Sequence, residues 1–443
     1  MKKLVTFFRL HENNTTISRE IIAGATTFMT LSYIIFVQPA VLSSCGMDFG
    51  AVMMATCIGS ALATFLMGFL ANYPIALAPA MGHNFYFAFV VCGIMKIPWQ
   101  IALAANFVSG ILLLILTLFK FREKLINAIP QCLKDGIAVG IGLLITLVGL
   151  EWAGIVVAHK GTLIGLGDLN NNYVLLSLFG LLLISILHAL KIKGAILWGI
   201  LITAILGIIT KTVLFQGVFS APPSIAPTLF KFDFSGLFAW NMISVIFVLF
   251  FLDLFDTIGT LIGIGEQGGF IKNGKFPRAG RALMSDAIGT TAGTVLGTST
   301  ITCYIESAAG VSAGGRTGLA NMVTGTLMLC AIFLYPLAKM FGGGIETSPG
   351  TYVYPVIAPA LIFIGSMMIK SIRNINWDDT TESIPTFLTM IIMPFAFGIT
   401  EGIAFGFISY ALLKLVTGKG KEVHWIVYLF AFLFVLRYIY LTQ

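Results

Sequence analysis

The chain has 443 residues, of which 58% are hydrophobic and 10% are charged, and its formal net charge at pH 7 is +7. This composition excludes a large soluble protein, because soluble domains have roughly 25% charged residues. Apolar stretches of the length that crosses a bilayer, about 20 residues, recur from Glu20 to the C-terminus and leave no room for a soluble catalytic domain. We therefore expect a multi-pass protein of the inner or plasma membrane.

Residues 1–19 are predicted to form a polar N-terminus. They contain no apolar core followed by a small-residue cleavage site, so we expect no cleavable signal peptide. They also contain Lys2, Lys3, Arg9 and Arg19, and basic residues accumulate on the cytoplasmic side of membrane proteins. We therefore place the N-terminus in the cytoplasm.

A first repeat of seven spans is predicted over residues 20–218, from apolar windows separated by short polar or Gly/Pro-containing breaks. A polar, proline-rich connecting loop follows at residues 219–239. The expected spans of this half are 20–43, 50–72, 77–95, 99–119, 134–150, 172–190 and 194–215.

A second repeat of seven spans is predicted over residues 240–417, by the same criteria. Residues 418–443 form a C-terminal hydrophobic segment, in which residues 424–441 are apolar enough to span. Their aromatic side chains suit the headgroup region, so we favour an interfacial or peripheral helix over an extra span. The expected spans of the second half are 240–265, 281–297, 301–314, 318–340, 351–369, 382–397 and 399–417.

The third and tenth spans are too short and too interrupted for ordinary spans. They contain YPIALAPAMGHNFYFAFVV from residue 73 and GTSTITCYIESAAGVSAGG from residue 297, at the same ordinal position in each half. Such paired, broken segments indicate the binding site of a transporter built from inverted repeats. We expect short extended segments near 75–77 and 301–304, each followed by a half-helix whose free N–H groups face a cavity.

The basic residues support this inversion, because they alternate between loops as the positive-inside rule expects. An odd number of spans per half makes the second half enter the membrane from the opposite side. The few basic residues assigned to the outer loops are Lys96, Lys160, Lys211, Lys231 and Lys339, with Arg437 left over. The cytoplasmic set contains Lys2, Lys3, Arg9, Arg19, Lys120, Arg122, Lys124, Lys134, Lys191, Lys193, Lys272, Lys275, Arg278, Arg281, Arg316, Lys370, Arg373, Lys414, Lys419 and Lys421.

Three carboxylates lie inside predicted spans, which costs on the order of 3 kcal/mol or more per residue at the bilayer centre. Asp253 and Asp256 are three residues apart, hence on one helix face, and cannot both ionise easily at low dielectric. That property suits a proton carrier. Glu306, on the tenth span, can accept two N–H bonds from the edge of a base. We predict that Asp256, Glu306 and Asp253 take part in proton coupling.

For other polar residues the sequence indicates a functional role less clearly. His83 is either a protonatable contact of the ligand or an ordinary polar residue near the cavity. Asp286 and Glu401 are predicted to be structural. A group of small residues on the eighth span is predicted to permit close helix packing rather than to touch substrate: Thr257, Gly259, Thr260 and Gly263.

Five stretches carry a resemblance to a known family. The tenth-span stretch at 297–321 (GTSTITCYIESAAGVSAGGRTGLAN) is highly specific. The other four are 23–42, 72–89 (NYPIALAPAMGHNFYFAF), 250–270 (FFLDLFDTIGTLIGIGEQGGF) and 377–406. On these residues the chain resembles the AzgA-like branch of the nucleobase:cation symporters, the hypoxanthine, adenine and guanine permeases.

The resemblance implies an all-α integral membrane protein of 14 transmembrane segments, arranged as two inverted seven-helix repeats and divided into core and gate domains. It also implies proton-coupled import of purine bases, with no cofactor besides the proton. Ala80 and His83 depart from the family's usual G-M-G-L-N, which weakens transfer of a particular substrate. The implied substrate-binding residues are Asp256, Glu306 and Asn84, with Ala80, Met81, Ser307 and Ala308 at the helix starts and His83 beside them.

Several alternatives stay open at this point. An anion transporter of the same architecture could hold its substrate at the two half-helix ends, although three acids at the site would repel it. A symporter for xanthine or uracil and a passive channel are further candidates. An intramembrane enzyme is disfavoured because the five histidines are dispersed and form no HExxH motif. The alternating charge indicates orientation in the bilayer rather than a nucleic-acid partner, and the sequence leaves a homodimer open.

Overall fold

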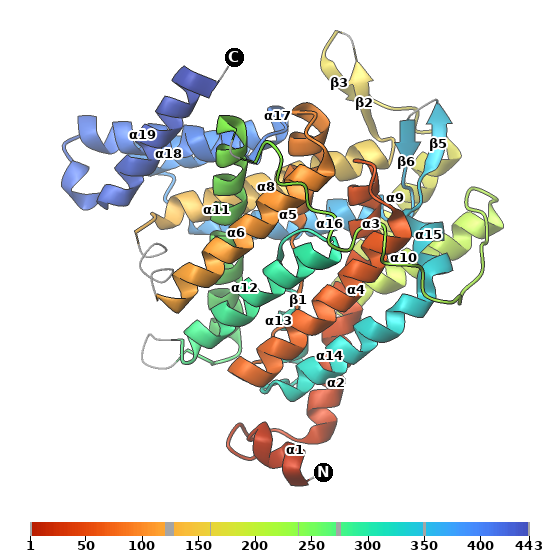
Figure 1. Cartoon of the computed structure of the whole chain (residues 1–443). Coiled ribbons are helices and arrows are strands. Elements are labelled where there is room, and N and C mark those ends of the chain that lie inside the picture. The colour runs from red at the N-terminus through yellow and green to blue at the C-terminus, as the bar shows by residue number, and fades with distance from the viewer. Residues whose placement is uncertain are drawn as a thin grey trace.

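The computed structural model describes residues 2–119, 128–159, 161–237, 239–271, 276–348 and 351–441. The basic residues of the charge pattern at positions 120, 122, 124, 160, 272 and 275 lie outside these ranges. Figure 1 shows a helical protein, with α1 and the N-terminus at one end and α18 and α19 at another. Within the described ranges, eight helical stretches are long and apolar enough to cross a membrane, as expected for a multi-pass protein.

The first half begins with side-chain caps that satisfy free N–H groups: Thr16 accepts from Arg19 N at the start of α2, and Asp48 accepts from Ala51 N at the start of α4. Its elements are α1 (Lys2–Phe7), α2 (Ile17–Leu31), α3 (Ile34–Ser43), α4 (Phe49–Leu66), η1 (Met67–Ala71), β1 (Leu77–Pro79), α5 (Met81–Phe85), η2 (Tyr86–Ile94), α6 (Trp99–Leu118), α8 (Gln131–Trp152), β2 (Val156–His159), β3 (Leu163–Leu166), α9 (Asn172–Ala189) and α10 (Ala195–Ile209).

The second half begins after the proline-rich loop with a single long helix, α11. Its elements are α11 (Trp240–Gln267), α12 (Ala279–Leu296), β4 (Ile301–Cys303), α13 (Ser307–Ser312), α14 (Leu319–Cys330), η3 (Ala331–Leu334), α15 (Tyr335–Gly342), β5 (Ile345–Ser348), β6 (Thr351–Val353), α16 (Ala358–Met368), η4 (Ile369–Asn374), α17 (Thr380–Phe395), α18 (Ile399–Val416), η5 (Gly420–Glu422) and α19 (Trp425–Leu441).

The helices pack in two groups that draw on both halves of the chain. In one group α2 contacts α13 and α14, α4 contacts α12 and α14, and α3 contacts α4 and α15. In the same group α6 contacts α11 and α12. In the other group α8 packs against α16, α17 and α18, and α9 packs against α10 and α16. Each group thus contains helices from the first and the second half, an arrangement that two interlocked repeats produce.

The structure differs from the expected spans in three places. The first predicted span is broken at Ser32 and Tyr33, between α2 and α3, and Pro39 lies inside α3, where it removes one helical hydrogen bond. The loop between α8 and α9 forms the hairpin β2–β3, which projects at the top of Figure 1. A second hairpin, β5–β6, occupies the first residues of the predicted span 351–369, whose helix begins only at Ala358.

The C-terminal helix α19 packs on α18. Arg437 on α19 forms an ion pair with Glu401 on α18, with Nη2 at 2.7 Å from Oε1, and the Tyr438 hydroxyl donates to the same carboxylate. Glu401 is therefore structural, as its sequence position indicated. An aromatic cluster joins α19 to α18 and α11 through edge-on and tilted ring contacts. Its members are Phe247, Phe251, Phe407, Phe430 and Phe434.

Candidate functional site

The two broken spans meet in the interior as a short antiparallel sheet. β1 pairs with β4, with Leu77 opposite Cys303 and Pro79 opposite Ile301. The pairing continues beyond the strands, since Ala80 N donates to the Thr300 carbonyl at 2.9 Å. These strands satisfy backbone groups that would otherwise be unpaired at membrane depth. They also place the starts of α5 and α13 beside one another, which explains why both spans are short.

Asp256 on α11 lies against β4. The Thr302 hydroxyl donates to Asp256 Oδ2 at 3.0 Å, and the aspartate is half-buried. Asp253, three residues earlier, is fully buried, and the Thr290 hydroxyl lies 3.1 Å from its Oδ2. Asp286 accepts from the Thr257 hydroxyl and is also fully buried. Of these three acids, Asp256 is the one with surface accessible to a ligand.

Glu306 lies on the residues that lead from β4 into α13. The Tyr33 hydroxyl donates to Glu306 Oε1 at 2.8 Å, and the Thr30 hydroxyl lies 3.2 Å from the Glu306 carbonyl oxygen. Both partners come from the interrupted first span, so the break between α2 and α3 brings Tyr33 to the tenth span. Glu306 is half-buried, like Asp256. The side-chain hydrogen bonds from Thr302 and Tyr33 therefore engage one oxygen of each carboxylate, Oδ2 of Asp256 and Oε1 of Glu306.

The remaining predicted residues occupy the two half-helix starts. Ala80 and Met81 are buried at the start of α5, and Asn84 follows one turn later with no exposed surface. Ser307 begins α13, and its hydroxyl accepts from Ala76 N at 2.9 Å, which ties α13 to the residues before β1. Ala308 is half-buried beside it. The structure therefore brings the predicted residues of both spans to one region.

His83 faces α11 rather than the half-helix start. Its Nε2 lies 3.3 Å from the Leu249 carbonyl, and only 1% of its surface is exposed. Leu249 precedes Asp253 by one helical turn. The imidazole thus links α5 to α11, so the contact that it makes in this conformation is one between helices.

The small residues of α11 do not all serve close packing, contrary to the sequence interpretation. Among the described residues, a Cβ at Gly259 would meet no atom within 4 Å, and one at Gly263 would only reach Ile305 Cδ1 at 3.7 Å. Ile305 is itself 49% exposed. The reason is that α11 turns this face toward open space next to Asp256. Gly259, Gly263 and Ile305 are all exposed, so this face of α11 is not covered by close helix contacts.

From the sequence, no contact with the ligand residues is assigned to three residues at this site. Tyr33, Gln38 and Thr302 hold or approach the predicted ligand residues, and all three are buried. Tyr33 and Gln38 stand out in YIIFVQPA, because polar side chains in an apolar span need partners. Thr302 lies in a run of threonines whose orientation depends on the strand pairing. No cluster of three or more potential metal ligands occurs among the described residues.

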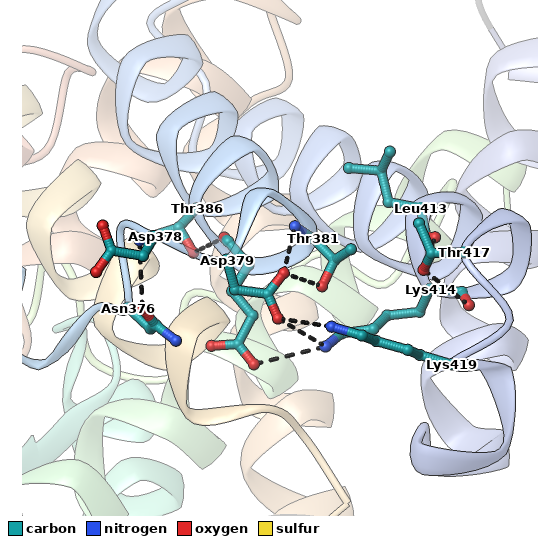
Figure 2. Close-up of polar contacts among 10 residues, drawn as sticks. Asn376, Asp378, Asp379, Thr381, Thr386, Leu413, Lys414, Thr417 and Lys419 are labelled. Carbon is teal, nitrogen blue, oxygen red and sulfur yellow. Dashed lines mark hydrogen bonds and ion pairs between the residues drawn. The ribbon is translucent and has the colours of Figure 1, made fainter.

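A separate polar cluster joins the start of α17 to the end of α18 (Figure 2). Lys414, almost fully buried on α18, lies 3.6 Å from Glu382 and 3.9 Å from Asp379, and Lys419 Nζ lies 3.1 Å from Asp379. A surface hollow beside it is lined by Asp378, Thr380 and neighbouring residues. This cluster contains none of the predicted ligand residues and closes one end of the α17–α18 pair.

The comparisons with known proteins agree with this geometry. The profile of the permease family matches residues 18–405. The chain is 44% identical to the adenine permease AdeP of Escherichia coli over 98% of this chain and 95% of that protein. It is 42% identical to the guanine/hypoxanthine permease PbuG of Bacillus subtilis over 98% of this chain and 99% of that protein.

A solved structure shares the fold at low identity. The transmembrane domain of the cyanobacterial bicarbonate transporter BicA superposes with a TM-score of 0.64, at 15% identity over 88% of this chain and 96% of that chain. This similarity shows the inverted-repeat transporter fold alone. With full-length relatives above 40% identity, the protein is a transporter rather than an enzyme. The chain belongs to the permease family of nucleobase transporters, among the adenine, guanine and hypoxanthine permeases.

Proposed function

We propose that this protein imports purine nucleobases together with protons, by alternating access. The observation that supports the proposal most is the pair Asp256 and Glu306, which come from different helices and are both half-buried. Each is held through one oxygen, by Thr302 or Tyr33, and keeps the other oxygen for a ligand. Two such acceptors suit the N–H edges of a purine. The names of the relatives AdeP and PbuG point to the same substrate class.

Coupling to protons would reside on the same acids. Protonation of Asp256 or Glu306 would favour the base-bound state that moves inward, because it removes the cost of a buried charge. Asp253, one turn away on α11 and beside Thr290, would exchange the proton with Asp256. The proton is the coupling ion of this proposal, and no other cofactor is involved.

The proposed topology has 14 transmembrane segments in two inverted repeats, with the N-terminus in the cytoplasm. The group of α8, α9, α10, α16, α17 and α18 would form the gate, and the group around β1 and β4 would form the core that moves against it. Support for the 14 segments comes from the paired broken spans and the alternation of basic loops.

Anion transport is the second candidate, since the fold is shared with a bicarbonate transporter. The two half-helix starts at α5 and α13 would then hold the anion. Asp256 and Glu306 oppose this function because their charges would repel an anion from the same place.

The test is uptake of radiolabelled adenine, guanine, hypoxanthine, xanthine and uracil into cells that lack their own permeases, with and without a protonophore. We expect accumulation of purines that the protonophore abolishes. Accumulation that survives the protonophore would contradict proton coupling. Absence of purine uptake, with the protein present in the membrane and bicarbonate or sulfate transported instead, would favour the anion function.

A further inference from the structure

A directed chain of hydrogen bonds runs from the first span to Asn84. Gln38 on α3 donates from Nε2 to the Ser299 hydroxyl oxygen at 3.0 Å and to the Thr298 hydroxyl oxygen at 2.9 Å. The Ser299 hydroxyl in turn donates to Asn84 Oδ1 on α5. All four residues have at most 1% exposed surface, so these bonds are shielded from competing solvent.

In this arrangement the chain orients the side-chain amide of Asn84. Ser299 has a single hydroxyl hydrogen, and because its oxygen accepts from Gln38, that hydrogen is directed to Asn84. Asn84 Oδ1 therefore accepts the hydrogen bond from Ser299, and the NH₂ group is the part of the amide that can donate elsewhere. The neighbour of Asn84 Nδ2 is Met81 Sδ at 3.9 Å, a weak acceptor at the start of α5. The amide thus presents donors, not its oxygen, to the half-helix start.

We infer that Gln38 and Ser299 are positioning residues that set base selectivity, by holding the Asn84 amide with its NH₂ toward the bound base. The inference rests on the proposed purine transport. The site would then combine two carboxylate acceptors, Asp256 and Glu306, with one amide donor. A base with a carbonyl oxygen or ring nitrogen facing Asn84 pairs with it, whereas a base with an amino group there leaves two donors opposed.

Selectivity between hypoxanthine and adenine tests this chain, because the two differ at C6 by an acceptor carbonyl and a donor amino group. We expect the wild-type protein to discriminate between them by about tenfold or more in kcat/KM. Gln38→Met or Ser299→Ala frees the Asn84 amide to rotate. The ratio of kcat/KM for hypoxanthine to kcat/KM for adenine should then move toward one by at least about fivefold. The double variant should match the single ones, since both act through one chain.

Thr298→Val is the matched control. It removes the other acceptor of Gln38 Nε2 but leaves the Gln38–Ser299–Asn84 chain intact, so the hypoxanthine to adenine ratio should stay at the wild-type value. Equal loss of uptake for both bases in Gln38→Met and Ser299→Ala would show a packing role only and overturn the inference. So would a wild-type protein that does not discriminate.

A second measurement is independent of transport. In full-length protein labelled with ¹⁵N at asparagine side chains and reconstituted in lipid nanodiscs, the Asn84 NH₂ signal can be assigned with Asn84→Asp. Ser299→Ala and Gln38→Met should both shift this signal, and Thr298→Val should not. An unchanged signal in Ser299→Ala would overturn the chain even if purines are carried. Shifted signals without any purine uptake would instead refute the proposed function, and with it the role in base selectivity, while the hydrogen-bond chain itself would stand.

Discussion

At the scale of single residues, the site depends on hydroxyl groups that hold acids. Tyr33 and Thr302 each donate to one oxygen of a carboxylate that would otherwise be free to rotate. A hydrogen bond to a charged group contributes about 1.5–3 kcal/mol. These hydroxyls therefore orient Glu306 and Asp256 while leaving one oxygen of each for a ligand.

Glu306→Gln is expected to abolish purine uptake while the protein still reaches the membrane. The amide has one accepting oxygen instead of two, so it cannot keep Tyr33 on one oxygen and offer another to the base, and it cannot hold the coupled proton. We therefore expect a loss of about a hundredfold or more. Tyr33→Phe should lower uptake less, by about tenfold, because it removes one hydrogen bond to a carboxylate. Initial uptake rates normalised to membrane protein check both, with the exposed Glu12→Gln as control. Wild-type accumulation in Glu306→Gln would contradict the assignment.

At the scale of secondary structure elements, the start of α17 depends on Asp379. This N-cap residue accepts from Thr381 N at 2.8 Å, and Lys419 lies 3.1 Å away. The hydrogen bonds from Thr381, followed by that from Lys419, hold the pKa of Asp379 well below its ordinary value of 3.8. A carboxyl whose pKa is lowered by folding contributes stability above its ordinary pKa and loses it on acidification.

The thermal unfolding midpoint of the purified protein should therefore fall more steeply below about pH 4 in the wild type than in Asp379→Asn. The amide can still cap α17 but does not titrate. Asp378→Asn, at the neighbouring position, should keep the wild-type pH dependence. If the unfolding midpoint of Asp379→Asn falls with acidification as steeply as that of the wild type, the hydrogen bonds of the Asp379 carboxylate with Thr381 and Lys419 do not contribute to stability.

Two glycines make a matched test of helix packing. A Cβ at Gly310 on α13 would overlap Thr27 Oγ1 and lie 2.7 Å from the Ala23 carbonyl, so α13 could not remain against α2. Gly310→Ala should therefore lower the unfolding midpoint and abolish uptake, as overpacking costs about 1–3 kcal/mol. Gly259→Ala should be tolerated, because its Cβ would enter open space. Equal behaviour of the two variants in unfolding and uptake would contradict this packing.

At the scale of the whole molecule, the proposed topology places residues 219–239 outside and both termini inside. A single cysteine at Ser224 in a cysteine-free protein should react with a membrane-impermeant maleimide in intact cells. One at Lys419 should react only after permeabilisation. A single cysteine in a tag after the C-terminus should likewise react only after permeabilisation if α19 lies along the interface. Labelling of that tag in intact cells would show that α19 crosses the membrane.

Much of the fold could be predicted from the sequence, because lipid permits few arrangements of the backbone. Apolar windows locate α4, α6, α11 and α18 to within a few residues. The break in the first span was missed, since Ser32 and Tyr33 are compatible with a helix and only their contacts reveal the interruption. The hairpins β2–β3 and β5–β6 were missed because short strands outside the spans leave little periodicity.

The sequence by itself determined the class of protein, the two broken spans and the acids Asp256 and Glu306, because apolar length and buried charge are local properties of the chain. The tertiary structure alone decided which hydroxyl holds each acid, that Gly259 faces open space and that Gln38 reaches Asn84 through Ser299. These contacts join residues up to 273 positions apart. They depend on the pairing of β1 with β4, and no local pattern specifies that pairing.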